Sequence, residues 1–318
     1  MTSWQAGRTF DGPYEGQGID PARLAERKGS LRVSVVLPAK NEELTVGQMV
    51  SAIRRDLMEA APLVDELIVI DSDSTDTTAQ VARDAGADVY AAKDIDAGLP
   101  SVVGKGEAIW RSLFVATGDV LVFLDADLTE WSTSYVSGLV LPFIENPHIV
   151  LSKGFYRRPA DGESGGGRVT ELVARPMIAL HRPVLAGIVQ PIGGEWAVRR
   201  EVISSMPLPS GYAVDLAVLM GVYDLKGVDA IAQVDLGVRM HMNQDLHALG
   251  LMAMQIIAYA ERRSGLQPDF WQVPLRQFDP QTHEPIDRQV ELVLRPAAAM
   301  ITPTWQARGL PGPVFPGV

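Results

Sequence analysis

Short apolar segments alternate with amphipathic ones through the first half of the chain. Residues 31–37, 65–70 and 119–124 are rich in β-branched and other apolar side chains, and residues 87–91 form a shorter run. The segments between these runs, such as 42–58, have the periodicity of helices. Strands that alternate with helices are typical of βαβ units around a buried parallel sheet. We therefore expect an α/β fold, with a Rossmann-like, mostly parallel sheet flanked by helices.

The second half is less regular, but it contains one clearly alternating segment. In residues 229–241 apolar and polar side chains alternate, which predicts a half-buried strand with a polar face. Helices are expected from residue 170 to about 180, near 215–225 and at 245–263. The residues before 31 show no periodicity and are predicted to form an arm. The proline-rich C-terminal residues predict an extended tail.

Composition narrows the classes of function. The 318 residues include 28 Lys and Arg against 39 Asp and Glu, a formal net charge of −11. Nucleic acids and anionic membrane surfaces attract a basic field, so we expect neither as a partner. The absence of cysteine excludes disulfides, thiolate zinc sites and cysteine nucleophiles. Because the sequence shows no apolar leader and no run of about 18 apolar residues, we expect a soluble cytoplasmic protein.

Three Asp-x-Asp triplets offer carboxylates for a metal site, at residues 71–73, 94–96 and 125–127. The motif alone is weak, because short acidic motifs arise by chance. Residues 94–96 follow no strand and are predicted to be solvated. Residues 71–73 end the second strand, where they either hold a ligand or cap the next helix. Residues 125–127 follow the most apolar strand, where carboxylates are costly without a cation, so this triplet is the predicted metal site.

The motifs also resemble those of a known family. Four segments occur in the order found in retaining glycosyltransferases of the GT-A fold: residues 36–43 (VLPAKNEE), 71–76 (DSDSTD), 104–106 (GKG) and 123–127 (FLDAD). The second half is similar, more narrowly, to the glucosyl-3-phosphoglycerate synthases and their mannosyl-3-phosphoglycerate relatives, in residues 165–176 (GGGRVTELVARP), 194–195 (GE), 211–212 (GY) and 237–241 (GVRMH). The resemblance covers about residues 31–263 and leaves the arm and the tail unmatched.

The resemblance implies an activity and a division of the chain. The activity is retaining transfer of glucose or mannose from a GDP- or UDP-linked sugar to the 2-hydroxyl of 3-phospho-D-glycerate. The implied cofactor is Mg²⁺ or Mn²⁺, and the implied assembly is a homodimer. The chain divides into an N-terminal arm, a nucleotide-sugar-binding half, an acceptor-binding half of the same GT-A domain and a C-terminal extension: residues 1–30, 31–130, 131–263 and 264–318.

By resemblance, the first half binds the nucleotide sugar. The implied donor-binding residues are Pro38, Ala39, Lys40, Glu42, Ser72, Asp73, Lys105, Asp125 and Ala126. The implied metal ligands are Asp127, His241 and Asp125. Lys105 stands between two glycines, which suits a cation on a backbone that approaches a ligand closely. The alternative is an exposed lysine in the first turn of a helix.

Residues 165–170 combine glycines with Arg168 and Thr170 and run directly into a predicted helix. Backbone N–H groups at a helix start, a guanidinium and a hydroxyl together suit a phosphate, and a flexible glycine linker is the alternative. The resemblance places the acceptor phosphate there, with the binding residues Gly166, Gly167, Arg168, Val169, Thr170, Tyr212 and Asn243. The implied catalytic residues are Asp127, Arg239, His241, Glu195 and Asp215.

Three positions depart from the pattern of this family. Asp215 stands where relatives usually carry glutamate, which leaves the sugar epimer open. Lys40 and Asp73 stand where leucine and glycine are commoner, and both lie near the expected position of the base. An aspartate accepts hydrogen bonds from the N1–H and the amine of guanine, so a GDP-linked donor is a hypothesis beside a UDP-linked one.

Other classes of protein share parts of this pattern. A polyprenyl-phosphate glycosyltransferase has a similar nucleotide half, but it normally carries a membrane helix or a basic amphipathic surface, which this sequence does not show. A sugar-phosphate nucleotidyltransferase requires a basic, glycine-rich loop after the first strand. A dinucleotide-binding module requires Gly-x-Gly-x-x-Gly at the same place. Residues 38–42 match neither motif.

Overall fold

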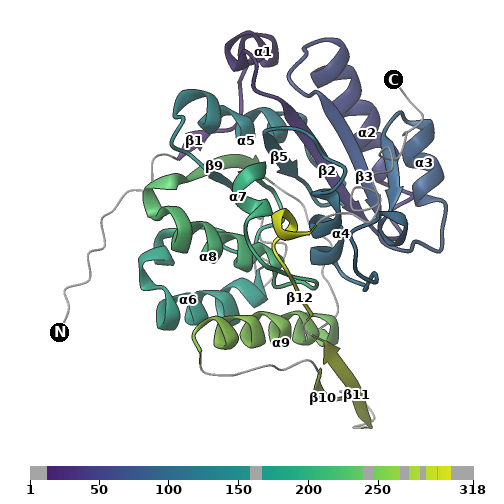
Figure 1. The fold of residues 1–318 in the computed structure, drawn as a ribbon, viewed down its shortest axis with the longest axis vertical. Helices are drawn as coiled ribbons and strands as arrows, with labels where there is room; N and C mark the ends of the chain where they lie inside the picture. Colours follow the sequence, from purple (N-terminus) through teal and green to yellow (C-terminus); the bar gives the residue numbers. More distant parts are fainter. Residues whose placement is uncertain are drawn as a thin grey trace.

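A central sheet of eight strands organises the part of the chain that the computed structural model describes (Figure 1). The described residues are 13–157, 167–238, 246–265, 272–279, 284–291 and 293–301. In spatial order the strands are β1 (Tyr14–Glu15), β9 (Ile231–Val238), β6 (Leu151–Arg157), β7 (Trp196–Arg199), β5 (Val120–Phe123), β2 (Val33–Ala39), β3 (Glu66–Asp71) and β4 (Asp88–Ala91). Every neighbouring pair is parallel except those of β7, which is antiparallel to β5 and β6. The predicted, mostly parallel sheet is confirmed.

Helices cover both faces of this sheet (Figure 1). One face carries α1 (Pro21–Lys28), α2 (Val46–Arg54), α3 (Thr78–Asp84) and α5 (Ser134–Glu145). The other carries α4 (Lys105–Ser112), α6 (Arg175–His181), α7 (Arg200–Ser204), α8 (Val214–Lys226) and α9 (Leu246–Arg263). Along β2, Val35 and Leu37 pack in the first core and Val36 in the second. Burial of both faces explains why these strands are continuous apolar runs.

Short helical segments complete the described part of the chain. Their bounds are η1 (Arg55–Glu59), η2 (Ala92–Asp94), η3 (Thr170–Ala174), η4 (Pro183–Gly187), η5 (Val228–Ala230) and η6 (Ala298–Met300). The first of them extends α2, and η3 runs directly into α6. The predicted helix from residue 170 to about 180 is therefore confirmed.

The first strand continues through Pro38, where the sequence pattern predicts its end. The last β2–β5 pair is Val36 with Phe123, while pairing with β3 continues to Ala39. On the β5 side of the strand, the carbonyl of Val36 accepts the N–H of Leu124. Backbone groups two residues apart in a strand point to the same side, so the nitrogen of Pro38 also faces the β5 side, beyond the last residue pair of β2 and β5. Proline therefore costs no ladder hydrogen bond there, which is why it is tolerated.

Strand β9 is buried on both faces, so the prediction of a half-buried strand with a polar face is wrong. It lies between β1 and β6, and its residues Ile231 to Leu236 are buried except Asp235. Gln233 accepts the N–H of Val189 and donates to the carbonyl of Gly187. These bonds satisfy the amide within the fold, because a buried polar group must be hydrogen-bonded.

Both ends of the described chain contain elements that periodicity does not reveal. Residues 13–30 include β1, which pairs with β9, and α1, whose Leu24 is buried. In the C-terminal segment β10 (Gln272–Phe278) and β11 (Pro285–Glu291) form an antiparallel hairpin, and β12 (Leu294–Arg295) pairs with β8 (Leu208–Pro209). The strands β1, β8 and β12 have two residues each, which is too short for a periodic pattern. None of the described helices is both long and apolar enough to cross a membrane.

Candidate active site

A cavity of about 860 Å³ opens where β2, β3 and β5 end. These are the carboxyl ends of parallel strands, where ligands bind in open α/β sheets. The opposite wall comes from residues 167–171, from the turn at 189–194, from residues 211–215 and from α9. The nucleotide-side and acceptor-side segments that the sequence predicts therefore meet at one cavity.

Most of the predicted site residues line this cavity. They are Pro38, Ala39, Lys40, Glu42, Ser72, Lys105, Asp125, Ala126, Asp127, Gly167, Arg168, Val169, Thr170, Tyr212 and Asp215. Two others do not belong to the lining: Glu195 is fully buried behind the wall, and Asp73 turns to the surface. Gly166, Arg239, His241 and Asn243 lie outside the described residues, so their roles stay predictions.

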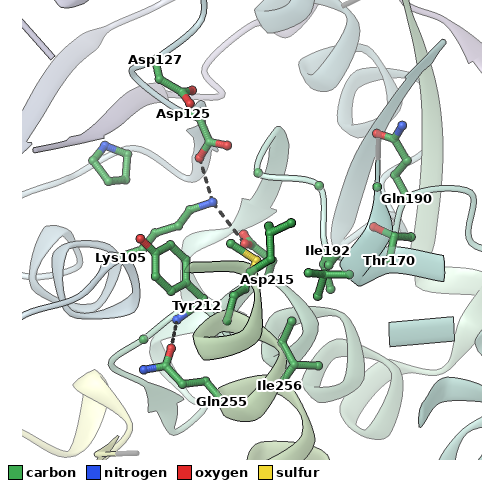
Figure 2. A pocket seen from close by; sticks show the side chains of 18 of the residues that line it. Lys105, Asp125, Asp127, Thr170, Gln190, Ile192, Tyr212, Asp215, Gln255 and Ile256 are labelled. Atoms are coloured by element: carbon green, nitrogen blue, oxygen red, sulfur yellow. Dashed lines mark hydrogen bonds and ion pairs between the residues drawn. The ribbon is translucent and has the colours of Figure 1, made fainter. Parts of the chain in front are cut away.

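Lys105 joins two carboxylates across the cavity floor. Its Nζ lies 2.7 Å from Asp125 Oδ1 and 3.1 Å from Asp215 Oδ2 (Figure 2). The Trp196 Nε1–H donates to the other oxygen of Asp215 at 2.8 Å. Burial by itself would lower the pKa of Lys105. The negative charges of Asp125 and Asp215 outweigh this effect and hold the pKa above its ordinary value, so the ammonium stays charged. The alternative of an exposed lysine is wrong, because the side chain is 16% exposed.

The carboxylates beside this lysine suit a hard divalent cation. Asp125 and Asp127 follow β5, and Glu42 approaches them from the loop after β2. Burial and then the charge of Asp127 raise the pKa of Glu42 to about 7. Oxygen ligands of this kind fit Mg²⁺ or Mn²⁺. Within the described ranges no three His, Asp or Glu side chains converge as a complete ligand set, and the predicted ligand His241 lies outside them.

The loops after β2 and β3 lock together through side-chain hydrogen bonds. The N–H of Asn41 donates to Ser74 Oγ at 2.9 Å, and the N–H of Glu42 donates to Thr78 Oγ1 at 2.7 Å. Asp76 accepts the N–H of Thr78 at 3.0 Å and so satisfies a donor in the first turn of α3. These bonds explain why α2 begins at Val46, later than the predicted start of the helix at residue 42.

Two of the three acidic triplets have surface members. Asp73 has a left-handed φ of 58°, a conformation that glycine adopts more easily, and its carboxylate lies 3.1 Å from Lys93 Nζ. Asp94 is exposed, and Asp96 accepts the N–H of Gly98 at 3.1 Å within its own turn. The prediction that residues 94–96 are a surface triplet is confirmed.

On the side that is predicted to bind the acceptor, hydrogen bonds join the segments of the cavity wall in two pairs. Arg168 and Thr170 border the cavity at the start of the helical segment. Arg175, one turn later, donates to the carbonyl of Val189 at 2.8 Å and so fixes the turn at 189–194. Tyr212 is held through its N–H, which donates to Gln255 Oε1 at 2.8 Å (Figure 2). Sequence reasoning missed Arg175 and Gln255, because their contacts join distant segments.

Lys153 is the largest omission of the sequence prediction. It lies on β6, is 1% exposed, and donates from Nζ to the carbonyl of Gly193 at 2.7 Å. Burial lowers the pKa of Lys153 to about 8. The negative charge of Asp215 opposes this change, and the positive charge of Lys105 adds to it. At the adjacent Gly194 a Cβ would collide with the carboxylate of Asp125, so this turn must approach the site as bare backbone. A lysine in a short strand normally indicates a solvent-facing position, so the sequence pattern does not predict that Lys153 is buried.

Comparison with known proteins identifies the family. The model for glycosyl transferase family 2 matches residues 34–206. The glucosyl-3-phosphoglycerate synthase of Mycolicibacterium paratuberculosis is 45% identical over 84% of this chain and 81% of its own length. The chain belongs to the glucosyl-3-phosphoglycerate synthase family of glycosyltransferases. The resemblance inferred from the motifs is thereby confirmed.

Solved structures of this family share the fold. The glucosyl-3-phosphoglycerate synthase of Mycobacterium tuberculosis, in complex with Mn²⁺, UDP-glucose and phosphoglyceric acid, is 43% identical with a TM-score of 0.80, covering 89% of this chain and 95% of that one. A second structure of that protein, with Mg²⁺ and UDP, is 42% identical with a TM-score of 0.81, covering 90% and 97%. The GT-A fold is therefore shown for this chain, and the predicted cofactor agrees with ions that this relative binds.

Removal of the Lys105 cation should destabilise the fold as well as the site. Lys105→Met leaves Asp125 and Asp215 facing each other in a largely buried place, so the free energy of unfolding should fall by about 3 kcal/mol. Urea denaturation at pH 7 measures this change. Lys93→Met is the matched control, because Lys93 is exposed and pairs with a single aspartate, and it should stay close to the wild type. Equal losses in the two variants would contradict the assigned network.

The lowered pKa of Lys153 should appear in the pH dependence of stability. Between pH 8 and the ordinary value of 10.5 the unfolded chain holds a proton on this lysine that the folded chain has released. The free energy of unfolding of the wild type relative to Lys153→Met should therefore rise over this interval, by up to about 1.4 kcal/mol per pH unit. Urea denaturation from pH 7 to 10 tests this. In Lys226→Met, which removes an exposed lysine, the free energy of unfolding should change with pH as it does in the wild type. A difference between the wild type and Lys153→Met that does not change with pH would refute the lowered pKa of Lys153.

Proposed function

We propose that this protein transfers glucose from UDP-glucose to the 2-hydroxyl of 3-phospho-D-glycerate, with retention at the anomeric carbon. The observation that carries the proposal is the single cavity at which the carboxylates after β5 and the Arg168–Thr170 segment meet. Relatives that are 42–45% identical carry the name of this activity. In this assignment residues 31–130 bind the donor and residues 131–263 bind the acceptor.

The donor lies, in this proposal, along the ends of β2, β3 and β5. Pro38, Ala39 and Ser72 offer backbone and a hydroxyl to the nucleoside, and Lys105 offers a fixed cation near the diphosphate. Asp125 and Asp127, with His241 as a further candidate, are the residues that would hold Mg²⁺ or Mn²⁺. When bound, the ion supplies positive charge that stabilises the departing diphosphate.

Uridine is favoured over guanosine by the position of Asp73. The guanine hypothesis requires this carboxylate to face the base, but it pairs with Lys93 and does not belong to the cavity lining. The same observation removes the main reason for a GDP-linked donor. Lys40 does line the cavity and is the remaining departure on this side.

Retention is best explained by attack on the face that the leaving group vacates. A double displacement requires a carboxylate as the covalent nucleophile. Among the carboxylates that line the cavity, Asp125 and Asp215 are engaged by Lys105, Glu171 pairs with Arg175, and Asp127 is a proposed metal ligand. A carboxylate bound to a cation is a weakened nucleophile. We therefore infer front-face displacement, in which the acceptor hydroxyl passes its proton to the departing diphosphate. Asp215 is oriented by Trp196 and lines the cavity, and in this proposal it binds a hydroxyl of the sugar.

A homodimer is part of the proposal. The apolar residues Leu172 and Leu180 are each 75% exposed, and Leu246 is 66% exposed. They lie on η3, α6 and α9, which contact one another. Light scattering of the purified chain measures its molar mass directly, and a monomer at all concentrations would contradict this part.

A donor panel tests the activity. The purified protein is mixed with UDP-glucose, UDP-mannose, GDP-glucose or GDP-mannose, Mg²⁺ or Mn²⁺ and 3-phosphoglycerate, and released nucleoside diphosphate is measured. UDP-glucose should be the best donor, and release should require the acceptor. Asp127→Ala should lower kcat/KM by at least about a hundredfold, whereas Asp94→Ala on the exposed triplet should have no effect. Absence of release with every donor would end the proposal.

The acceptor assignment is tested by kinetics on the Arg168 side. Arg168→Met and Thr170→Val each remove polar contacts proposed for the acceptor phosphate, so the KM for 3-phosphoglycerate should rise about tenfold or more while the KM for UDP-glucose stays near the wild-type value. Arg182→Met is the control, since Arg182 follows α6 outside the cavity lining and pairs with Asp224. A rise in the donor KM alone would assign this segment to the donor.

A further inference from the structure

We propose that residues 293–301, which we call the C-terminal strap, hold the Lys105 side and the Tyr212 side of the cavity in place. Within the strap, Arg295 is the positioning residue, and it acts through Glu107 on Lys105. None of the strap residues belongs to the cavity lining. The inference about position stands on the contacts of the strap itself, and only its consequence for nucleotide binding rests on the proposed function.

The strap adds a strand to a loop that borders the cavity. Its β12 pairs with β8, with Leu294 opposite Pro209 and Arg295 opposite Leu208. The N–H of Ser210 donates to the carbonyl of Val293 at 2.8 Å. Residues 211 and 212 of the cavity wall follow directly after this ladder, so their backbone position depends on it.

Arg295 enters a buried cluster of charges at the side of α4. The side chains of Arg295 and Glu107 are 6% and 1% exposed, and the two Glu107 oxygens accept from Arg295 at 2.6 and 2.9 Å. Arg111 binds the same carboxylate at 2.8 Å from one turn further along the helix. Loss of Arg295 would leave Glu107 paired with Arg111, but it would remove the hydrogen bond to Glu107 Oε2 in a buried place, which is costly.

The same cluster holds the loop that leads into α4. Arg295 donates to the carbonyl of Pro100 at 2.6 Å, and Arg111 donates to the carbonyl of Leu99 at 2.7 Å. Beside this cluster, Trp110 Nε1–H donates to the carbonyl of Pro296 at 2.8 Å, and the guanidinium of Arg295 lies over the Trp110 ring. The loop and the helix are therefore bound to the strap at separate points.

The first turn of α4 is pressed against the strap-bound loop. The N–H of Glu107 donates to the carbonyl of Ser210 at 2.8 Å. At Gly104 and at Gly106 an added Cβ would collide with the backbone of residues 209–211, so glycine is required on both sides of Lys105 by close packing. The backbone on both sides of Lys105 is therefore packed against this loop, and we infer that the contacts of Lys105 with Asp125 and Asp215 depend on the same packing.

The hairpin that precedes the strap supports the Tyr212 side. Gln255 of α9 accepts the N–H of Tyr212 and donates from Nε2 to the carbonyl of Glu291 at the end of β11 (Figure 2 shows the first of these bonds). The C-terminal segment therefore reaches the cavity wall by two routes, through Gln255 and through β12.

Hydrogen exchange tests the strap without reference to any ligand. In Arg295→Met the amides of residues 99–112 and 208–212 should exchange at least about tenfold faster, while those of β2 and β3 stay at the wild-type rate. Arg276→Met is the matched control, since Arg276 lies in the same C-terminal extension but pairs with Asp287 at the surface. Wild-type exchange of both segments in Arg295→Met would overturn the proposal.

Titration calorimetry with UDP and Mn²⁺ tests the consequence for the site. The Kd should rise about tenfold in Arg295→Met and by less in Arg295→Lys, because lysine keeps the charge beside Glu107 and loses the bond to Pro100. In a Lys105→Met background, Arg295→Met should add no further loss, because the strap acts through Lys105. Arg276→Met should bind as the wild type does.

A purely structural role makes different predictions. It would lower the unfolding temperature of Arg295→Met and leave its Kd and its exchange rates unchanged at temperatures where the variant is folded, which would overturn the proposal. If Arg295→Met does not fold, the same measurements are made on Arg295→Lys. A wild-type Kd and wild-type exchange rates in Arg295→Lys would then overturn the proposal. If the wild type itself does not bind UDP with Mn²⁺, the proposed donor fails, and the exchange measurement still decides whether the strap holds these segments.

Discussion

The ion pairs of Lys105 join the three segments that form the floor of the cavity. Lys105 begins α4, Asp125 follows β5, and Asp215 lies in the first turn of α8. One ammonium between two carboxylates is favourable in a largely buried place only when all three groups are held at contact distance. The positions of the two helices and of the strand end therefore depend on one another, and the shape of the cavity depends on all three.

The backbone that sets these distances comes from distant parts of the chain. The antiparallel strand β7 lies beside β5 and places Trp196 where its indole N–H orients Asp215. The turn at 193–194 approaches Asp125 as bare backbone and is held from behind by Lys153. Buried polar side chains in a GT-A enzyme of this family thus shape a site that they do not line, because the low dielectric around them makes each satisfied contact strong.

Local sequence patterns predict much of this architecture. β2, β3 and β5 are continuous apolar runs because both faces of the sheet are covered, and the polar residues that follow them meet at one edge because the strands are parallel. Lys105 between two glycines is visible in the same way. Residues 94–96 are predicted at the surface, and Asp94 and Asp96 lie there, although the strand β4 and the short helix η2 precede them. Short elements such as β1 and β12 leave no periodic signal.

The sequence by itself determined the fold class, the family and the strand ends that carry the site, since these depend on patterns within a few residues. Only the tertiary structure decided which charges meet. It pairs Asp73 with Lys93 at the surface, buries Glu195 behind the wall, and brings Arg295 to Glu107 from 188 residues away. The physical reason is that a local pattern shows whether a side chain is charged, while the distance between two charges depends on how remote segments pack.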